Sequence, residues 1–459
     1  MDIFHVLAAI AALLTVAHLG GLLAVRLRLP PMLGELTGGL LLGATLLGRL
    51  LPEASHWLFP PTPASGTVPA VVPVLAFCSQ LGLLLLMFVG GLGMRRLVSR
   101  QDVKAVAWIC GAGVLAPVLV GVLIFQFVSF DDYLGPAKSS VALRIILVAA
   151  LAVTSIPVIT RIFIDLGLME TRLARVVLSV AVIEDVLLYV GISLAVGIAN
   201  GTSKADVSIP SYLHMDPGGT PYIAWHVAAS LILIAVASLA YKVLPSHSTP
   251  SRHVITGRSP LGWTIAFLCV VTLFGMLLGL APIFGALIAG IAVANDERPE
   301  FVTARQHIET FAMATFIPIY FALIGVSLDL VGDFDWRFTL GLLVVGTSVK
   351  FTASLLGARV AGEAPPMARA LAISVNARGG PGIVLATTAF AAGIIDPRAY
   401  TALIVLALAT SVFAGSWLAW MLRKDPETER HVRAGSLAVP QQRRTGPKRH
   451  ASVAPGPGA

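Results

Sequence analysis

The chain consists of long apolar stretches separated by short polar segments. A helix that crosses a bilayer needs roughly 20 mostly apolar residues. Stretches of about this length lie at residues 3–25, 31–51, 72–94, 104–129, 142–164, 173–199, 222–244, 261–279, 281–296, 308–330, 338–361, 367–393 and 399–422. The pattern predicts an all-α polytopic membrane protein with thirteen transmembrane helices. The boundary between the eighth and ninth is the weakest, since only Gly279–Pro282 separates them.

The composition supports this assignment. Hydrophobic residues make up 56% of the chain and charged residues 12%, whereas soluble domains carry about 45–50% and about 25%. These values exclude a soluble enzyme, a disordered chain and a coiled coil. The three cysteines, Cys78, Cys110 and Cys269, lie within apolar runs, so we expect neither a disulfide framework nor a structural metal site.

Basic residues predict the orientation. Lys and Arg gather in alternate loops, as in the segment from Arg95 to Lys104, and such loops face the cytoplasm. We therefore expect the N-terminus outside the cell membrane and the C-terminus inside. Residues 423–459 are basic and rich in Pro and Gly, which predicts a disordered cytoplasmic tail. No nucleic-acid partner is expected.

Two segments repeat one another. Residues 31–40 (PMLGELTGGL) and 282–291 (PIFGALIAGI) share Pro, Gly, Leu and Gly in register. They open the second and ninth predicted helices, an odd offset that would invert the second copy in the membrane. Inverted repeats are typical of secondary transporters, whose substrate site lies near the bilayer midplane.

Five charged residues lie inside the predicted spans. They are Glu35, Glu184, Asp185, Lys350 and Arg378. An ion at the bilayer centre costs about 2.5–3.5 kcal/mol on insertion scales, so such residues are functional candidates. Glu184 and Asp185 are adjacent and diverge by about 100° on a helix. We expect one to line a cavity and the other to pair with Lys350.

Two predicted spans carry helix-breaking sequences near their centres. One is Thr154-Ser155-Ile156-Pro157, and the other runs from Asn376 to Gly382 through Arg378. Irregular backbone at this depth is tolerated only inside protein or beside a cavity, where Thr154 and Ser155 could supply oxygen ligands. For Arg378, neutralisation of the half-helix dipoles and a direct transport role both stay open.

Hard oxygen ligands with two acids and one lysine suit a small monovalent cation that competes with protons. No His or Cys accompanies the acids, so we expect no cofactor and no metal beyond the transported cation. Two alternatives stay open. An organic-anion or drug transporter could use the same inverted-repeat scaffold, and a membrane-embedded enzyme would need a reactive group near the interface.

At these motifs the chain resembles the second family of monovalent cation:proton antiporters, which carries the sodium/hydrogen exchanger domain. The resemblance covers residues 1–422. It is carried by four segments, Pro31-Met32-Leu33-Gly34-Glu35, Gly285 with Ala289-Gly290, Ile317–Asp329 and Asn376-Ala377-Arg378-Gly379.

The resemblance implies a homodimer with an inverted-repeat fold, in which crossed discontinuous helices meet at the ion site. It implies a dimerisation part at about 1–100 and 260–332, and a core part at about 101–199 and 335–422 that moves as an elevator. Asp185 and Lys350 fall on the family's ion-binding acid and lysine. Glu184 departs from the usual Asp, Asn or Gln; because it keeps the charge, the resemblance favours electrogenic exchange.

Overall fold

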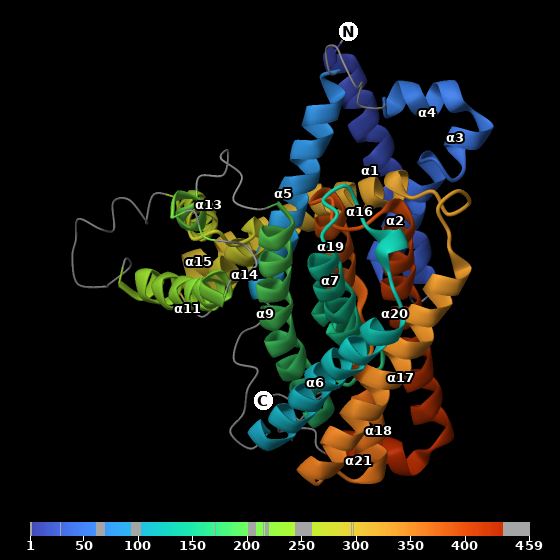
Figure 1. Ribbon diagram of the computed structural model, residues 1–459, viewed down its shortest axis with the longest axis vertical. Coiled ribbons are helices and arrows are strands. Elements are labelled where there is room, and N and C mark those ends of the chain that lie inside the picture. The colour runs from blue at the N-terminus through green and yellow to red at the C-terminus, as the bar shows by residue number, and fades with distance from the viewer. Residues whose placement is uncertain are drawn as a thin grey trace, which may run out of the picture.

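The structure is a computed structural model, and it describes residues 2–27, 29–60, 69–92, 102–169, 171–200, 208–213, 215, 220–243, 259–294, 296 and 298–434. Its regular elements within these ranges are helices, together with one isolated β-bridge between Leu134 and Ile395 (Figure 1). The helices of the N-terminal half are α1 (Asp2–Arg26), α2 (Pro31–Leu42), α3 (Leu47–Leu50), α4 (Pro52–Leu58), α5 (Val71–Leu92), α6 (Val103–Phe127), the 3₁₀ turn η1 (Asp131–Tyr133), α7 (Ser140–Ala152), α8 (Ile156–Asp165), α9 (Arg172–Asn200) and α10 (Ile209–Tyr212). Those of the C-terminal half are α11 (Thr220–Val243), α13 (Pro260–Leu277), α14 (Pro282–Ala294), α15 (Pro299–Ala314), α16 (Phe316–Ser327), α17 (Trp336–Ala361), α18 (Pro365–Ser374), α19 (Gly379–Ala391), α20 (Pro397–Lys424) and α21 (Pro426–Ala434).

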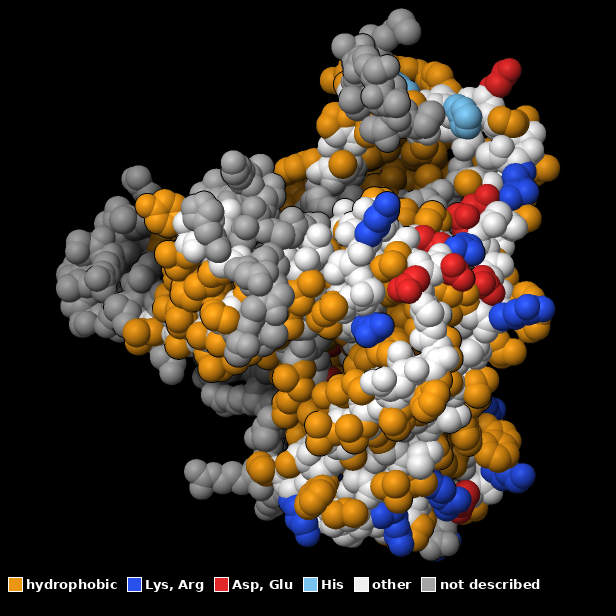
Figure 2. Space-filling model, viewed as in Figure 1, with side chains coloured by type: hydrophobic (Ala, Val, Ile, Leu, Met, Phe, Trp, Pro, Cys, Tyr) orange, Lys and Arg blue, Asp and Glu red, His pale blue; other side chains and the backbone are white. Residues whose placement is uncertain are grey.

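The apolar helices are long enough for a membrane protein. Among the described residues, nine helical stretches have the length and hydropathy to cross a bilayer, and three shorter apolar helices cover 140–152, 224–237 and 282–294. Figure 2 shows apolar side chains in a broad band, with charged side chains gathered below it and above it. The chain is a multi-pass membrane protein; the total of thirteen spans stays a prediction.

Helices α1, α2, α5, α14 and α16 form a group that packs through glycines. A Cβ on Gly34 would lie 1.9 Å from the carbonyl oxygen of Gly20, and one on Gly39 would lie 1.9 Å from that of Ala322. Gly290 approaches the backbone of Phe88 in the same way, at 2.2 Å. These contacts bring α2 against α1 and α16, and α14 against α5, closer than any larger residue permits.

Helices α6 to α9 and α17 to α20 form the second group. It contains both predicted helix interruptions, since α7 ends at Ala152 before α8 begins at Ile156, and α18 ends at Ser374 before α19 begins at Gly379. An ion-pair network joins the starts of α6 and α9 to the α17–α18 loop. Arg172 contacts Asp102 at 2.8 Å and Glu363 at 2.8 Å.

Two helix boundaries need comment. The eighth and ninth predicted spans are separate helices, α13 and α14, joined by a turn in which Gly279 has φ +84°. The predicted span 308–330 overlaps one apolar helical stretch, Pro299–Ser327, which is interrupted at Thr315 because α15 ends at Ala314 and α16 begins at Phe316. Pro318 has no N–H with which to bond the carbonyl of Ala314. His18 of α1 bonds that carbonyl instead, at 3.0 Å.

The start of the predicted disordered tail also differs. Residues 426–434 form α21, in which Val432 is fully buried. Asp425 pairs with Arg369 of α18 at 3.5 Å. These contacts give a short helix the tertiary support that it needs in order to form. Residues 435–459 lie outside the described residues.

Candidate ion site

The two helix interruptions lie against each other. The backbone N–H of Ser155 donates to the carbonyl of Ala377 at 2.6 Å, and the Thr154 hydroxyl donates to the carbonyl of Val375 at 2.5 Å. Thr154 and Ser155 are fully buried. Backbone groups that lose their helical partners at one break are thus hydrogen-bonded by residues of the other break. Irregular backbone inside a membrane requires such partners within the protein.

Hydroxyl groups also receive the first N–H groups of α19. The N–H of Gly380 donates to Ser155 Oγ at 3.2 Å, and that of Gly379 donates to Ser411 Oγ at 3.0 Å. Gly379 has φ +35°, and a Cβ there would lie 2.2 Å from Val158 Cγ2. Only glycine fits at position 379. The glycine-rich segment that the sequence marked as a helix interruption therefore lets α19 begin in close contact with α8.

A buried ion pair lies beside the breaks. Lys350 Nζ of α17 is 2.7 Å from Glu184 Oε2 of α9, and both side chains are at most 1% exposed. The same ammonium donates to the carbonyl of Ala152, the last residue of α7. The sequence predicted that one acid of the adjacent pair would contact Lys350, and the structure identifies it as Glu184.

Asp185 faces away from this pair. Its carboxylate is buried, and its Oδ1 atom has no hydrogen-bond partner among the described residues. Tyr189 lies one turn further along the same face of α9, and its hydroxyl donates to the Met87 sulfur of α5 at 2.8 Å. Asp185 therefore points toward the boundary between the two helix groups, whereas Glu184 points into the second group.

Arg378 is held by backbone and amide oxygens. Its guanidinium donates to the carbonyls of Ala150 and Leu151 at 2.9 Å each, and to that of Gly346 at 2.8 Å. It also donates to Asn376 Oδ1 at 3.0 Å. The first two acceptors are free carbonyls at the C-terminal end of α7, where a positive charge interacts favourably with the helix dipole.

Glu35 is not part of this cluster. It is half-buried on α2, where its side chain lies near Gly21 of α1. The other six predicted residues, Thr154, Ser155, Glu184, Asp185, Lys350 and Arg378, come together around the two breaks.

The sequence analysis assigned no role to three neighbours of the site, Asn376, Ser411 and Tyr189. Asn376 orients Arg378 and donates to the carbonyl of Thr347 at 3.1 Å. The position of Asn376 inside the interrupted segment was the one sequence feature that could have indicated this role. Ser411 and Tyr189 lie in ordinary apolar helices and carried no signal of their own. Within the described part of the chain, no group of three or more His, Cys, Asp or Glu side chains could hold a metal ion.

Irregular half-helices around buried ionisable groups define a secondary transporter rather than a soluble catalyst. The comparison with protein families agrees, because the model "Sodium/hydrogen exchanger, transmembrane" matches residues 12–424. The chain belongs to this family of cation/proton antiporters, and it is not an enzyme.

Individual relatives are distant but span nearly the whole chain. The chain is 24% identical to the Na⁺/H⁺ antiporter NhaS4 of Synechocystis sp., covering 89% of this chain and 94% of the relative. It is 27% identical to the Na⁺/H⁺-K⁺ antiporter GerN of Bacillus cereus, covering 88% and 92%. Its fold resembles the sodium proton antiporter MjNhaP1 of Methanocaldococcus jannaschii, with a TM-score of 0.59 and 14% identity over 92% of this chain and 99% of the other.

Proposed function

We propose that this protein exchanges a monovalent cation, sodium or potassium, for protons across the cell membrane. The names of the relatives support both cations, since NhaS4 is a Na⁺/H⁺ antiporter and GerN a Na⁺/H⁺-K⁺ antiporter. The observation that carries the proposal is the buried carboxylate of Asp185, whose Oδ1 atom has no hydrogen-bond partner among the described residues, beside two interrupted helices.

Asp185 is the proposed binding group for cation and proton alike. An ionised carboxylate without a partner is costly in a low-dielectric interior. The Asp185 site can therefore cross the membrane only when it carries a cation or a proton, which makes the exchange obligatory. Thr154 and Ser155 are proposed as further oxygen ligands, because their hydroxyls lie at the breaks. The Thr154 hydroxyl donates to the carbonyl of Val375 and keeps its acceptor lone pairs, and Ser155 Oγ accepts from the Gly380 N–H and keeps a second lone pair.

Glu184 and Lys350 are proposed to make the exchange electrogenic. Their contact at 2.7 Å is buried and fixed by the Ala152 carbonyl, so a cation entering at Asp185 perturbs a charged pair rather than a neutral one. Arg378 is proposed to neutralise the freed carbonyls of α7. Glu35 is proposed as a supporting residue of α2, away from the ion.

We further propose that residues of about 1–100 and 260–332 form a dimerisation part of a homodimer. Residues of about 101–199 and 335–422 would form the core that moves as an elevator. The distribution of polar contacts supports this division. The pair Arg49–Asp329 lies within the dimerisation part, and the pair Lys350–Glu184 lies within the core part.

Hydrogen bonds that cross the proposed boundary involve neutral groups. Tyr189 donates to Met87, Tyr320 bonds Thr387 at 3.1 Å, and Tyr400 bonds Ser327 at 3.2 Å. Neutral hydrogen bonds contribute about 0.5–1.5 kcal/mol net each, less than bonds to charged groups. A boundary held by such bonds is easier to slide than one held by buried ion pairs.

The proposal also includes the fold and its orientation: thirteen transmembrane helices with an inverted repeat, an external N-terminus and a cytoplasmic C-terminus. They rest on the hydrophobic pattern, on the match between residues 31–40 and 282–291, and on the distribution of Lys and Arg.

The test is exchange in proteoliposomes that contain an internal pH dye. Sodium and potassium pulses are given separately, with and without a potassium diffusion potential set by an ionophore. We expect a pH change for at least one cation, whose rate depends on the potential. Glu184→Gln should retain some exchange but lose that dependence. No pH response to either cation in the wild-type protein would disprove the proposal.

A further inference from the structure

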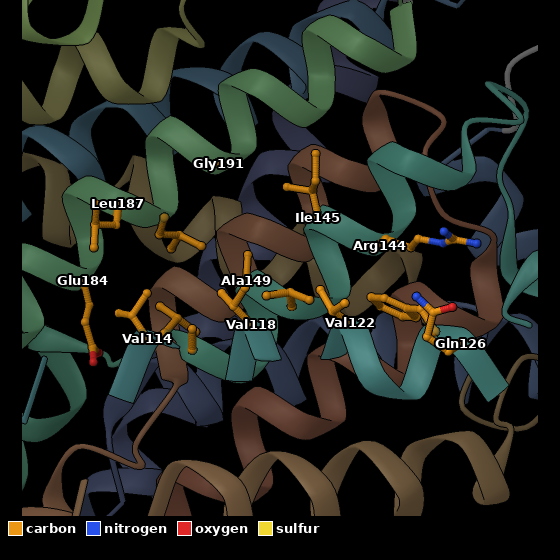
Figure 3. Close-up of a pocket in the computed structure, with 15 residues that line it drawn as sticks. Val114, Val118, Val122, Gln126, Arg144, Ile145, Ala149, Glu184, Leu187 and Gly191 are labelled. Atoms are coloured by element: carbon orange, nitrogen blue, oxygen red, sulfur yellow. The ribbon is translucent and has the colours of Figure 1, made fainter. Parts of the chain in front are cut away.

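A groove of about 430 Å³ runs between α6, α7 and α9 (Figure 3), and Asp185 is not among the residues that line it. Its inner end contains Ala152, Val153 and Glu184, all of which belong to the ion site or the α7 break. Its walls are almost entirely apolar. They include Val114, Val118 and Val122 of α6, Ile145 and Ala149 of α7, and Leu187 of α9.

The groove opens sideways. Val122 is 50% exposed, Leu187 48% and Val118 37%. In a bilayer these side chains face hydrocarbon, so the occupant of the groove must itself be apolar along most of its length.

The far end of the groove is polar and positively charged. Figure 3 shows Arg144 of α7 and Gln126 of α6 together at the end opposite Glu184. Arg144 is exposed, and its guanidinium lies 5.7 Å from the centroid of the Phe125 ring. No ion pair joins it to a carboxylate in the described part of the chain. The guanidinium keeps its donors available for an anion.

The dimensions fit one lipid chain. Val114 and Gln126 are twelve residues apart on one helix, which corresponds to about 18 Å. One leaflet of the hydrocarbon core is about 15 Å deep. A slightly inclined acyl chain would therefore reach from the Arg144 end to the Glu184 end.

We propose that this groove binds an anionic phospholipid, with its phosphate on Arg144 and Gln126 and one acyl chain along α6. A chain at the inner end covers Ala152 and the stem of Glu184. It thereby excludes water from the pair between Glu184 and Lys350, whose attraction weakens when water enters. The bound lipid thus stabilises the charged pair.

The experiment measures lipid binding without relying on transport. Purified protein in detergent receives phosphatidylglycerol or phosphatidylcholine, and retained lipid is counted by native mass spectrometry while the unfolding temperature is followed. We expect wild-type protein to retain phosphatidylglycerol preferentially and to unfold at a higher temperature with it. Arg144→Gln should reduce that preference about fivefold, the equivalent of about 1 kcal/mol for one basic residue.

Two further variants separate the head-group contact from the groove. Val118→Trp should fill the groove and abolish the stabilisation by phosphatidylglycerol. Arg337→Gln is the matched control, since Arg337 is an exposed arginine at the start of α17 and is not part of the groove lining. It should keep the wild-type preference.

Equal phosphatidylglycerol preference in Arg144→Gln and wild type would overturn the proposal. So would unchanged stabilisation of Val118→Trp, or a response to free oleate with none to phosphatidylglycerol. Lipid retention is counted directly and does not depend on transport. The result of the lipid experiment and the result of the exchange assay can therefore be interpreted separately.

Discussion

The two helix groups are held together by different kinds of contact. In the group of α1, α2, α5, α14 and α16, glycines let backbones touch, as at Gly39 and Ala322. In the group of α6 to α9 and α17 to α20, buried side chains bond freed backbone, as Arg378 does at Gly346. The first kind of contact brings helix backbones together without a polar side chain between them. The second holds charge and irregular backbone in an apolar medium, which an ion-binding site requires.

One ion pair inside the second group and one beside the first group also differ. Lys350 and Glu184 are at most 1% exposed and 2.7 Å apart, whereas the side chains of Arg49 and Asp329 are 47% and 27% exposed and 3.1 Å apart. A buried pair is costly to break because it leaves an uncompensated charge, while an exposed pair is solvated by water.

Lys350→Ala should destabilise the protein by about 3–5 kcal/mol, because the Glu184 carboxylate is left buried without its partner. Thermal unfolding in detergent measures the effect. The double variant Lys350→Met with Glu184→Gln should recover most of the loss, since no buried charge remains. Equal destabilisation of the single and double variants would show that packing, not charge, holds this site.

Gly39→Ala should destabilise the first group by about 1–3 kcal/mol, because the new methyl would overlap the backbone of Ala322. Gly90→Ala in α5 is the control, since nothing lies within 4 Å of a Cβ there. It should be neutral or slightly stabilising, because Ala is the better helix former. Similar unfolding temperatures for the two variants would contradict the close backbone packing.

Asp335→Ala should cost about 1 kcal/mol, because its carboxylate caps the start of α17. The backbone N–H of Phe338 and the hydroxyl of Tyr133 hold the pKa of Asp335 below its usual range. Because the pKa is lower in the folded state, the Asp335 carboxylate stabilises the folded protein at pH values above its unfolded pKa of about 3.9. This stabilisation is lost as the pH falls through the lower, folded-state pKa. Unfolding measured across this acid range should therefore depend less on pH in Asp335→Ala than in the wild type. An identical slope would exclude this contribution.

Arg49→Ala should change stability by less than about 1 kcal/mol, and the change should shrink as salt is added. Unfolding temperatures at low and high salt measure it. A loss as large as that of Lys350→Ala would remove the contrast between the two pairs.

The sequence predicted which buried charges lie together better than it predicted the helix boundaries, and the binding of an ion there stays a prediction. Buried charges are expensive in lipid, so Glu184, Lys350 and Arg378 stood out, and Pro or Gly marked both interruptions. The break at Thr315 was missed because its cause, Pro318, lies three residues beyond it. Which acid contacts Lys350 depends on the rotation of α9 against α17. That rotation is set by packing with α6 and α7, and no local residue pattern encodes it.

The assignment of Asp185 as the exchange site is tested most directly by cation pulses on proteoliposomes of wild type, Asp185→Asn and a control, Asp333→Asn, which alters an acid in the loop before α17. Asparagine nearly preserves the shape of the side chain but cannot alternate between a charged and a protonated state. We predict a pH response for the wild type and the control, and none for Asp185→Asn when all three proteins are present in equal, folded amounts. A wild-type response from Asp185→Asn would show that Asp185 is not the exchange site.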